Sequence, residues 1–335
     1  MHLELDLINR CNLRCVMCYH SQDHARHART AHMTPEAFAA IAGCLLPSCY
    51  RLSLSLGNEP LMSPHFTDIL RIAAPYAVPN VNFFTNAQLL DAQKIAAILD
   101  CGVTQVCVSV DGATAGTYNG IRRDGDFDRL LSNVSALIAA RAARAGSRLR
   151  VRFDMVMMQR NVHEMPDLVR LAARLGVDEL DFVHVVAFEG LDMERESLRH
   201  TMALSNYWLD RALSEAASLG IPVVYHPAPF TLVGDNPGGA GTVSPFQADP
   251  YCPYPFFHVT MGPGGHVLPC PYSHGEAPYG QVSAETPVDM IWLGPKFTAL
   301  RQRILAHDPP EMCRRCSFLA NRHPNLPEFF ATRRN

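Results

Sequence analysis

Three cysteines near the start of the sequence are the residues best suited to chemistry. Cys11, Cys15 and Cys18 are separated by three and then by two residues. Cysteine thiolates are the usual ligands of iron–sulfur clusters, and a cubane [4Fe–4S] cluster takes four ligands. Three thiolates from one short loop would leave one iron open to bind a small molecule and pass it an electron. Structural zinc is the alternative, but zinc prefers four closed ligands, commonly in paired C-x2-C elements.

A second group of cysteines lies near the end of the sequence. Cys252 and Cys270 have seventeen residues between them, Gly265 precedes Cys270 by five positions, and Cys313 and Cys316 form a C-x2-C pair. Four thiolates make a closed site, so this group predicts either structural zinc or a fully ligated [4Fe–4S] cluster. The spacing by itself leaves both alternatives open. The remaining four cysteines occur singly among apolar residues, and we interpret them as core residues.

Polar motifs follow three apolar, strand-like runs of the sequence. The motif Gly57-Asn58-Glu59-Pro60 comes directly after one such run. Glycine permits a close approach of the backbone, and a carboxylate accepts hydrogen bonds from an ammonium group. The next two runs end at Asn86 and Ser109, and Asp111 and Arg122 follow Ser109. In isolation, Asp111 reads as part of a turn and Arg122 as part of a solvated helix face.

Taken together, these motifs resemble those of the radical S-adenosylmethionine (SAM) superfamily and of its SPASM/Twitch branch. The C-x3-C-x2-C loop is similar to the superfamily signature, and the motif at 57–60 to Gly-Gly-Glu-Pro, with Asn58 replacing a glycine. Thr85-Asn86-Ala87 is similar to Thr-Asn-Gly, and the stretch 109–114 to Ser-Ile-Asp-Gly-Ala-Thr. The resemblance covers essentially the whole chain. It implies a SAM-cleaving [4Fe–4S] cluster on the first cysteine group and one auxiliary [4Fe–4S] cluster, in a Twitch module, on the second.

The resemblance also implies which residues contact SAM. The backbone and carboxylate of the motif at 57–60 would hold the SAM amine, while Ser109 and Arg122 would contact its ribose and carboxylate. Phe188 is a candidate for apolar packing against adenine. The expected SAM contacts are Gly57, Asn58, Glu59, Pro60, Asn86, Ser109, Asp111, Arg122 and Phe188.

An α/β architecture would position these residues. Up to about residue 230, strand-like runs alternate with amphipathic stretches, which predicts a parallel sheet whose active site lies at the carboxyl ends of the strands. The expected strands are 2–8, 51–56, 81–85, 105–110, 150–158 and 179–186, and the expected helices 35–46, 64–74, 91–100, 126–144 and 163–175. The resemblance implies a partial (β/α)6 TIM-like barrel over residues 1–230. A small C-terminal Fe–S (Twitch) domain would occupy residues 231–335, after a stretch rich in proline and glycine.

The composition disfavours several classes of protein. The net charge is −3 and the basic residues are scattered, which argues against a nucleic-acid partner. No apolar run approaches the roughly 20 residues that span a bilayer, so no membrane partner is expected. The N-terminus alternates like a strand and lacks the features of a signal peptide. We therefore expect a cytoplasmic protein in which patterned cysteines bind metal rather than form disulfides.

The resemblance implies that SAM is cleaved to a 5′-deoxyadenosyl radical, which abstracts hydrogen from the substrate. The chain resembles 2-deoxy-scyllo-inosamine dehydrogenase and cytosylglucuronate decarboxylase. We therefore expect the oxidation of an alcohol to a ketone on a sugar, aminocyclitol or nucleoside in antibiotic biosynthesis. The alternatives are radical decarboxylation of a sugar-uronate nucleoside and modification of a peptide. The first strand begins at residue 2, leaving no N-terminal peptide-recognition domain, which favours a small molecule. A low-potential electron donor such as flavodoxin or ferredoxin is implied.

Candidate catalytic residues lie on the last two expected strands. Arg152 and Asp154 share one strand face, and a polar pair inside a barrel is costly unless it binds something. His184 and Glu189 occupy a similar place at the end of the sixth strand. Each could hold a hydroxyl group, bind a carboxylate or take a proton; an internal ion pair or a rim position is the alternative. The four histidines between residues 20 and 32 are expected in a loop that shields the SAM cluster rather than in a metal site.

Overall fold

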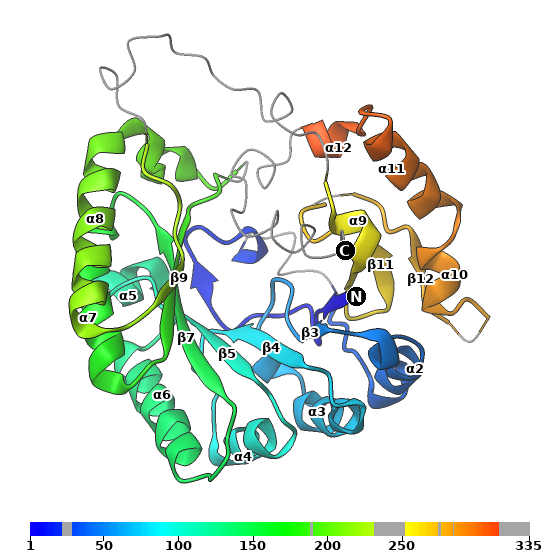
Figure 1. The fold of residues 1–335 in the computed structure, drawn as a ribbon, viewed down its shortest axis with the longest axis horizontal. Helices are drawn as coiled ribbons and strands as arrows, with labels where there is room; N and C mark the ends of the chain where they lie inside the picture. Colours follow the sequence, from blue (N-terminus) through cyan, green and yellow to red (C-terminus); the bar gives the residue numbers. More distant parts are fainter. Residues whose placement is uncertain (22–28, 188–189, 231–251, 274–275, 284, 315–335) are drawn as a thin grey trace, which may run out of the picture.

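The fold is a curved sheet with helices along its outer face, seen in a computed structural model (Figure 1). The structure describes residues 1–21, 29–187, 190–230, 252–273, 276–283 and 285–314. Within these residues the main sheet has ten strands in the order β12-β11-β10-β1-β3-β4-β5-β7-β8-β9. A second, two-stranded sheet pairs β2 (Arg14–Cys15) with β6 (Arg122–Arg123).

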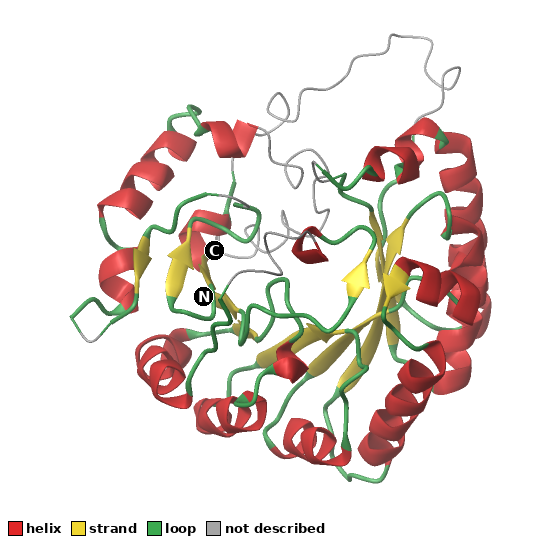
Figure 2. Ribbon diagram, turned by 180° about the vertical axis from the view of Figure 1, so that it is seen from behind, coloured by secondary structure: helices red, strands yellow, loops and turns green. Residues whose placement is uncertain are grey.

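Six parallel strands, each followed by a helix, form the partial barrel. The strands are β1 (His2–Leu5), β3 (Arg51–Ser53), β4 (Asn80–Thr85), β5 (Gln105–Ser109), β7 (Arg150–Met157) and β8 (Glu179–His184). The helices after them are α2 (Pro35–Leu45), α3 (Phe66–Ala73), α4 (Ala92–Asp100), α5 (Ala115–Ile121) with α6 (Phe127–Ala142), α7 (Met165–Leu175) and α8 (Met202–Leu219). Figure 2 shows the helices outside the strands. This arrangement confirms the partial (β/α)6 barrel.

Helix α8 and strand β9 are among the elements of the barrel that were not predicted from the sequence, as is α5. Helix α8 ends at Gly220, whose φ of 66° caps the helix in the left-handed conformation. Strand β9 (Val223–Tyr225) then pairs parallel with β8. β9 therefore adds a seventh parallel strand at the edge of the sheet formed by β8.

The first two strands are shorter than predicted. β1 ends at Leu5 and β3 at Ser53, although the apolar pattern continues in both. The backbone N–H groups of residues 56–58 donate to the side chain of Asp6 instead of to a neighbouring strand. The chain therefore leaves the sheet early, and the freed segments become the loops that carry the cysteines and the motif at 57–60.

The C-terminal segment continues the same sheet. Strand β10 (His258–Met261) pairs parallel with β1, in the register His2 opposite His258. Two antiparallel strands, β11 (His266–Leu268) and β12 (Gly280–Gln281), extend it. The helices of this part are α9 (Tyr254–Phe257), α10 (Val288–Trp292), α11 (Pro295–Leu305) and α12 (Glu311–Arg314). The loop-rich module expected from the sequence thus shares a sheet with the barrel.

The two faces of the sheet differ in polarity. Apolar strand residues such as Leu3, Phe83 and Phe153 are fully buried in the main core cluster. The alternating residues in one register row on the concave face are polar, running from Glu4 to Ser53, Asn82, Gln105 and Arg150. A complete TIM barrel fills its interior with branched apolar side chains. This partial barrel therefore has a polar interior.

Candidate active site

A cavity of about 970 Å³ lies on the concave face of the sheet. Its walls include the three N-terminal cysteines and residues from the barrel strands and the C-terminal segment. Among the predicted site residues, the cavity is lined by Cys11, Cys15, Cys18, Gly57, Asn58, Glu59, Asn86, Ser109, Arg122 and Arg152. The fold therefore brings half of the site residues selected from the sequence to one place.

The cysteine loop is held by donors directed at its sulfur atoms. Strands β2 and β6 place Cys15 opposite Arg122, whose Nη1 donates to Cys15 Sγ at 3.7 Å. The Nδ2 of Asn86 donates to Cys11 Sγ at 3.8 Å. Burial raises the pKa of Cys11 to about 12 and that of Cys15 to about 11, and it also raises the pKa of Cys18. Buried thiols of this kind ionise when a metal binds them, so the donor set suits a cluster.

One carboxylate that the sequence reasoning missed holds the loop at 57–60. Asp6 Oδ1 accepts hydrogen bonds from the N–H groups of Leu56, Gly57 and Asn58 at 2.7, 3.2 and 3.3 Å. Asp6 Oδ2 accepts from Asn58 Nδ2 at 2.8 Å. Its position as a lone aspartate inside the apolar run Leu5–Ile8 is the feature of the sequence that could have revealed it. Asp6 thus links the start of the cysteine loop to the motif at 57–60, and Asn58 gains a structural role.

Glu59 joins this motif to the end of β4. Its carboxylate accepts from Thr85 Oγ1 at 2.7 Å, from Asn86 N at 2.8 Å and from Leu61 N at 3.1 Å. Burial raises the pKa of Glu59 to about 7, against the lowering effect of these hydrogen bonds. Ala87 has a φ of 58°, the left-handed conformation that favours glycine. The turn typical of Thr-Asn-Gly is therefore present although Ala87 replaces the glycine.

Arg122 is buried, so its interpretation as part of a solvated helix face is wrong. Only 8% of the residue is exposed, because β6 turns it inward after α5. Its Nη2 pairs with Asp111 Oδ2 at 2.7 Å, while Asp111 Oδ1 accepts from Val156 N at 2.8 Å. The Nε of Arg122 is buried and has no hydrogen-bond partner among the described residues. Because Arg122 and Ser109 both line the cavity, this donor fits the anionic group of a bound cofactor.

Arg152 and Asp154 form the internal ion pair considered from the sequence, and a third residue joins them. Arg152 Nη2 lies 2.7 Å from Asp154 Oδ1 and 3.3 Å from Asp181 Oδ2. Asp181 on β8 lies directly opposite Asp154 on β7. Arg152 and Asp181 line the cavity, and the guanidinium of Arg152 lies 5.5 Å from the ring centre of Phe84. Asp181 was missed because its run was treated only as a strand.

The other candidates are placed differently. His184 ends β8, does not line the cavity, and has its ring 5.0 Å from that of Phe230. Burial lowers its pKa. Phe188 and Glu189 lie outside the described residues. Pro60 begins the short helix η3 (Pro60–Met62) and is buried.

The histidine segment is described only at its two ends. The ring of His20 packs so closely on Gly57 that a side chain at position 57 would collide with it. His32 forms an isolated β-bridge with Ile8. His24 and His27 lie outside the described residues. No group of three His, Cys, Asp or Glu side chains in the described part of the chain is arranged around a single metal ion. The thiolates of a cluster bind different irons, so they need not meet at one point.

The second cysteine group is described for three of its four members. Cys252 precedes α9, Cys270 follows β11, and Cys313 belongs to α12, whereas Cys316 lies outside the described residues. Gly265, with φ at 77°, makes the turn between β10 and β11 that brings Cys270 back. Both Cys270 and Cys313 interact electrostatically with Tyr279. Burial raises the pKa of Tyr279, and the two thiols raise it further.

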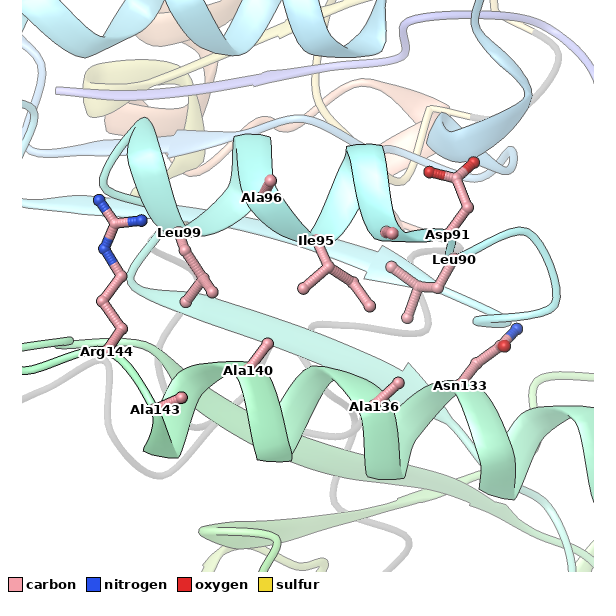
Figure 3. Close-up of a pocket in the computed structure, with 11 residues that line it drawn as sticks. Leu90, Asp91, Ile95, Ala96, Leu99, Asn133, Ala136, Ala140, Ala143 and Arg144 are labelled. Atoms are coloured by element: carbon pink, nitrogen blue, oxygen red, sulfur yellow. The ribbon is translucent and has the colours of Figure 1, made fainter.

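A second hollow, of about 600 Å³, lies outside the barrel between α4 and α6. Figure 3 shows Ile95 and Leu99 of α4 facing Ala136 and Ala140 of α6 across it. Small and apolar side chains dominate this lining. We therefore assign the chemistry to the larger cavity on the concave face.

Comparison with known families decides what this arrangement is. The model of the radical SAM superfamily matches residues 5–172, half of the chain. The chain belongs to the radical SAM superfamily. The model of the SPASM iron–sulfur cluster-binding domain matches residues 252–317. The cofactors are therefore SAM, a [4Fe–4S] cluster and auxiliary iron–sulfur clusters bound by the C-terminal domain.

Individual radical SAM proteins are similar over different lengths. The GTP 3′,8-cyclase of Rhodopseudomonas palustris (strain TIE-1) is 29% identical over 180 residues, which are 52% of this chain and 50% of the cyclase. The chain thus spans about half the length of the curated relatives it matches. SuiB from Streptococcus suis, solved with S-adenosylmethionine, matches with a TM-score of 0.67 at 15% identity, over 96% of this chain and 71% of SuiB. The protein anSMEcpe with bound AdoMet matches with a TM-score of 0.66 at 14% identity, over 95% of this chain and 87% of its own.

The residues of this chain fit the expected cofactors. Cys11, Cys15 and Cys18 would hold the SAM-cleaving cluster, and the unpartnered Nε of Arg122 on the same cavity wall suits a SAM carboxylate. Among the described residues, no helix has the length and apolar character needed to span a membrane.

Proposed function

We propose that this radical SAM enzyme oxidises an alcohol to a ketone on a polyhydroxylated small molecule, namely a sugar, an aminocyclitol or a nucleoside. The single observation that carries this proposal is the polar wall of the concave cavity. Glu4, Ser53, Asn82, Gln105 and Asp181 all line it. Hydroxyl groups both donate and accept hydrogen bonds, so a ligand rich in them would replace the water such a wall binds.

Two groups of residues in the cavity lining suit different tasks. When bound, the [4Fe–4S] cluster and SAM supply a one-electron cleavage of SAM that leads to hydrogen abstraction from a substrate C–H bond. In the first group, Glu59 and Arg122 would orient the amine and the carboxylate of SAM. In the second group, on β7 and β8, Arg152, Glu179 and Asp181 would orient the hydroxyl groups of the substrate.

The charges in the cavity favour alcohol oxidation over decarboxylation of a uronate. A substrate carboxylate would need a cation to receive it. The cavity lining contains three arginines and four carboxyl side chains, and two of the arginines, Arg122 and Arg152, are already paired with Asp111 and with Asp154 and Asp181. A neutral or amino-substituted polyol fits this balance better. The same reasoning disfavours a triphosphate, although the similar cyclases are named for GTP.

Peptide substrates are the competing class. SuiB has been solved with its precursor peptide SuiA, and anSMEcpe with the Cp18Cys peptide. At 14% identity this likeness concerns the fold. We also propose a single auxiliary [4Fe–4S] cluster on Cys252, Cys270, Cys313 and Cys316, as in a Twitch module. The resemblance, rather than any contact in the cavity, is our ground for placing the reaction in antibiotic biosynthesis.

The test is an anaerobic assay of SAM cleavage with the reconstituted enzyme and a flavodoxin or ferredoxin donor. The panel contains aminocyclitols, nucleosides with and without a uronate carboxylate, GTP and short peptides. We expect an aminocyclitol or a neutral nucleoside to stimulate 5′-deoxyadenosine formation, with a product two hydrogens lighter. The control is the Cys15→Ala variant, which is expected to form no 5′-deoxyadenosine. Stimulation by peptides alone, or a product that has lost CO2, would contradict the proposal.

A further inference from the structure

Two carboxyl groups face each other across the sheet beside the cavity. Asp154 on β7 and Asp181 on β8 are directly opposite in register, and one guanidinium nitrogen, Arg152 Nη2, approaches both carboxyl groups. A hydrogen bond between two carboxyl groups requires a proton on one of them. Asp181 Oδ1 is buried and has no hydrogen-bond partner among the described residues. A proton shared with Asp154 would satisfy it.

Charge balance around the pair supports one shared proton. Arg152 approaches both carboxyl groups, with Nη2 at 2.7 Å from Asp154 Oδ1 and at 3.3 Å from Asp181 Oδ2. Two ionised carboxylates with one guanidinium would leave a net negative charge in a buried place, which is costly. One proton on the pair makes the group of three residues neutral. This is the physical situation of other carboxyl pairs that titrate as a unit.

Three other titratable side chains, Glu179, Cys107 and Tyr225, interact with the pair. Glu179, next to the pair on β8, is bound to Arg150 and to Gln105. Burial raises the pKa of Cys107 on β5 and of Tyr225 on β9, so both are neutral near pH 7. Burial raises the pKa of Asp154 as well, and that of Asp181 to about 7, while Arg152 opposes both shifts. Near neutral pH, the carboxyl pair is therefore the group in this cluster able to take up or release a proton.

We propose that Asp154 and Asp181 form a proton-sharing carboxyl pair that binds a hydroxyl or ammonium group of the substrate and accepts the proton of the hydroxyl that is oxidised. Asp181 lines the cavity and so provides the contact. As the substrate O–H bond breaks, a new O–H bond forms on the ionised carboxylate. The radical that bound SAM supplies would remove the hydrogen atom from the C–H bond. A bound iron–sulfur cluster would accept the remaining electron. The identity of the substrate rests on the proposed function; the shared proton does not.

The shared proton can be tested without turnover. Holoprotein labelled with ¹³C-aspartate is titrated from about pH 5 to about pH 9 and followed by infrared difference spectroscopy. We expect a carboxylic-acid carbonyl band that disappears with a midpoint near pH 7. The band should be absent in Asp181→Asn and in Asp154→Asn, and unchanged in the control Asp167→Asn, which alters an exposed ion pair with Arg170. Two results would show that Asp154 and Asp181 share no proton. One is absence of the band in the wild-type protein above about pH 6, and the other is its survival in Asp181→Asn or Asp154→Asn.

The role in proton uptake needs a second measurement. With 2-deoxy-scyllo-inosamine as probe, we expect Asp181→Asn to lower kcat about 100-fold, the size of a general-base contribution. The acidic limb of the kcat/KM profile should disappear as well. An unchanged kcat and pH profile would overturn the role of the pair as proton acceptor. If no hydroxylated compound stimulates SAM cleavage, the proposed function fails, and the infrared titration still decides the shared proton.

Discussion

Asp6 is the single residue whose contacts most change the interpretation of the loop at residues 57–60. Its side chain accepts three backbone hydrogen bonds and one from Asn58, and only 5% of the residue is exposed. We predict that Asp6→Ala lowers the free energy of unfolding by about 2–3 kcal/mol, because buried N–H groups lose their acceptor. SAM affinity should fall about tenfold, because the loop loses its fixed geometry. Urea denaturation and equilibrium SAM binding measure the two effects.

The control for Asp6 is Asp68→Ala on α3, which removes an exposed ion pair with Arg71 and should change neither quantity. Asp6→Asn is the conservative variant, since it keeps one acceptor oxygen. SAM affinity that is unchanged in Asp6→Ala would show that the loop is positioned without Asp6.

Ala87 gives a second prediction at this scale. The left-handed conformation at φ 58° costs an alanine about 1 kcal/mol, which a glycine avoids while losing more entropy on folding. Ala87→Gly should therefore change stability by less than about 1 kcal/mol. Ala87→Val should lower the free energy of unfolding by more than about 2 kcal/mol, since β-branched residues are outliers in this region. Chemical denaturation compares the two; equal stabilities would show that the turn relaxes.

Among the elements, the pairing of β1 with β10 joins the barrel to the C-terminal segment. Glu4 and His258 meet across it, with His258 Nε2 at 3.0 Å from Glu4 Oε2, and the rings of His2 and His258 lie 4.0 Å apart. Burial raises the pKa of Glu4 to about 8 and lowers the pKa of His258 to about 3 and of His2 to about 2. The junction is therefore uncharged at neutral pH, with the proton of the pair on Glu4.

These shifts predict how stability depends on pH. Unfolded Glu4 ionises above about 4.5 and folded Glu4 only near 8, so raising the pH between these values favours unfolding. Unfolded histidines take up protons below about 6.5 and the folded ones do not, so lowering the pH below 6.5 also favours unfolding. These groups together give a maximum near pH 6.5.

The Glu4→Gln variant tests this junction, because glutamine keeps a donor toward His258 and does not ionise. We expect its stability to fall less steeply than that of the wild type between pH 6.5 and 8, as measured by urea denaturation. Glu36→Gln, an exposed change on α2, is the control. If the stability of Glu4→Gln fell with pH as steeply as that of the wild type, Glu4 would already be ionised in the folded protein.

At the scale of the whole molecule, two groups of cysteines should act independently. We predict roughly eight iron atoms per reconstituted chain, and roughly four in the double variant Cys252→Ala/Cys270→Ala. This variant should keep SAM cleavage above background, since the first group is intact, but lose most product. Iron analysis with quantified 5′-deoxyadenosine measures both. Four irons and one zinc in the wild-type chain would contradict the auxiliary cluster.

Much of the barrel and of the site could be predicted from local patterns. The six strands and five of the helices follow from apolar periodicity, and Cys11, Cys15, Cys18 and the motif at 57–60 were selected by their spacing. Such signals are local, because a short loop or an amphipathic helix is specified by neighbours in sequence. Residues 5–172, where the superfamily model matches, contain most of them.

Tertiary structure decided the rest, because strand pairing joins residues that are distant in sequence. The pairing of His2 with His258 is invisible to any local pattern, as is the contact of Cys15 with Arg122. The opposition of Asp154 and Asp181 likewise depends on the register of β7 with β8. The sequence alone therefore determined the cofactor chemistry, which depends on short ligand spacing. The charge and shape of the cavity arise only when the parallel strands are brought side by side.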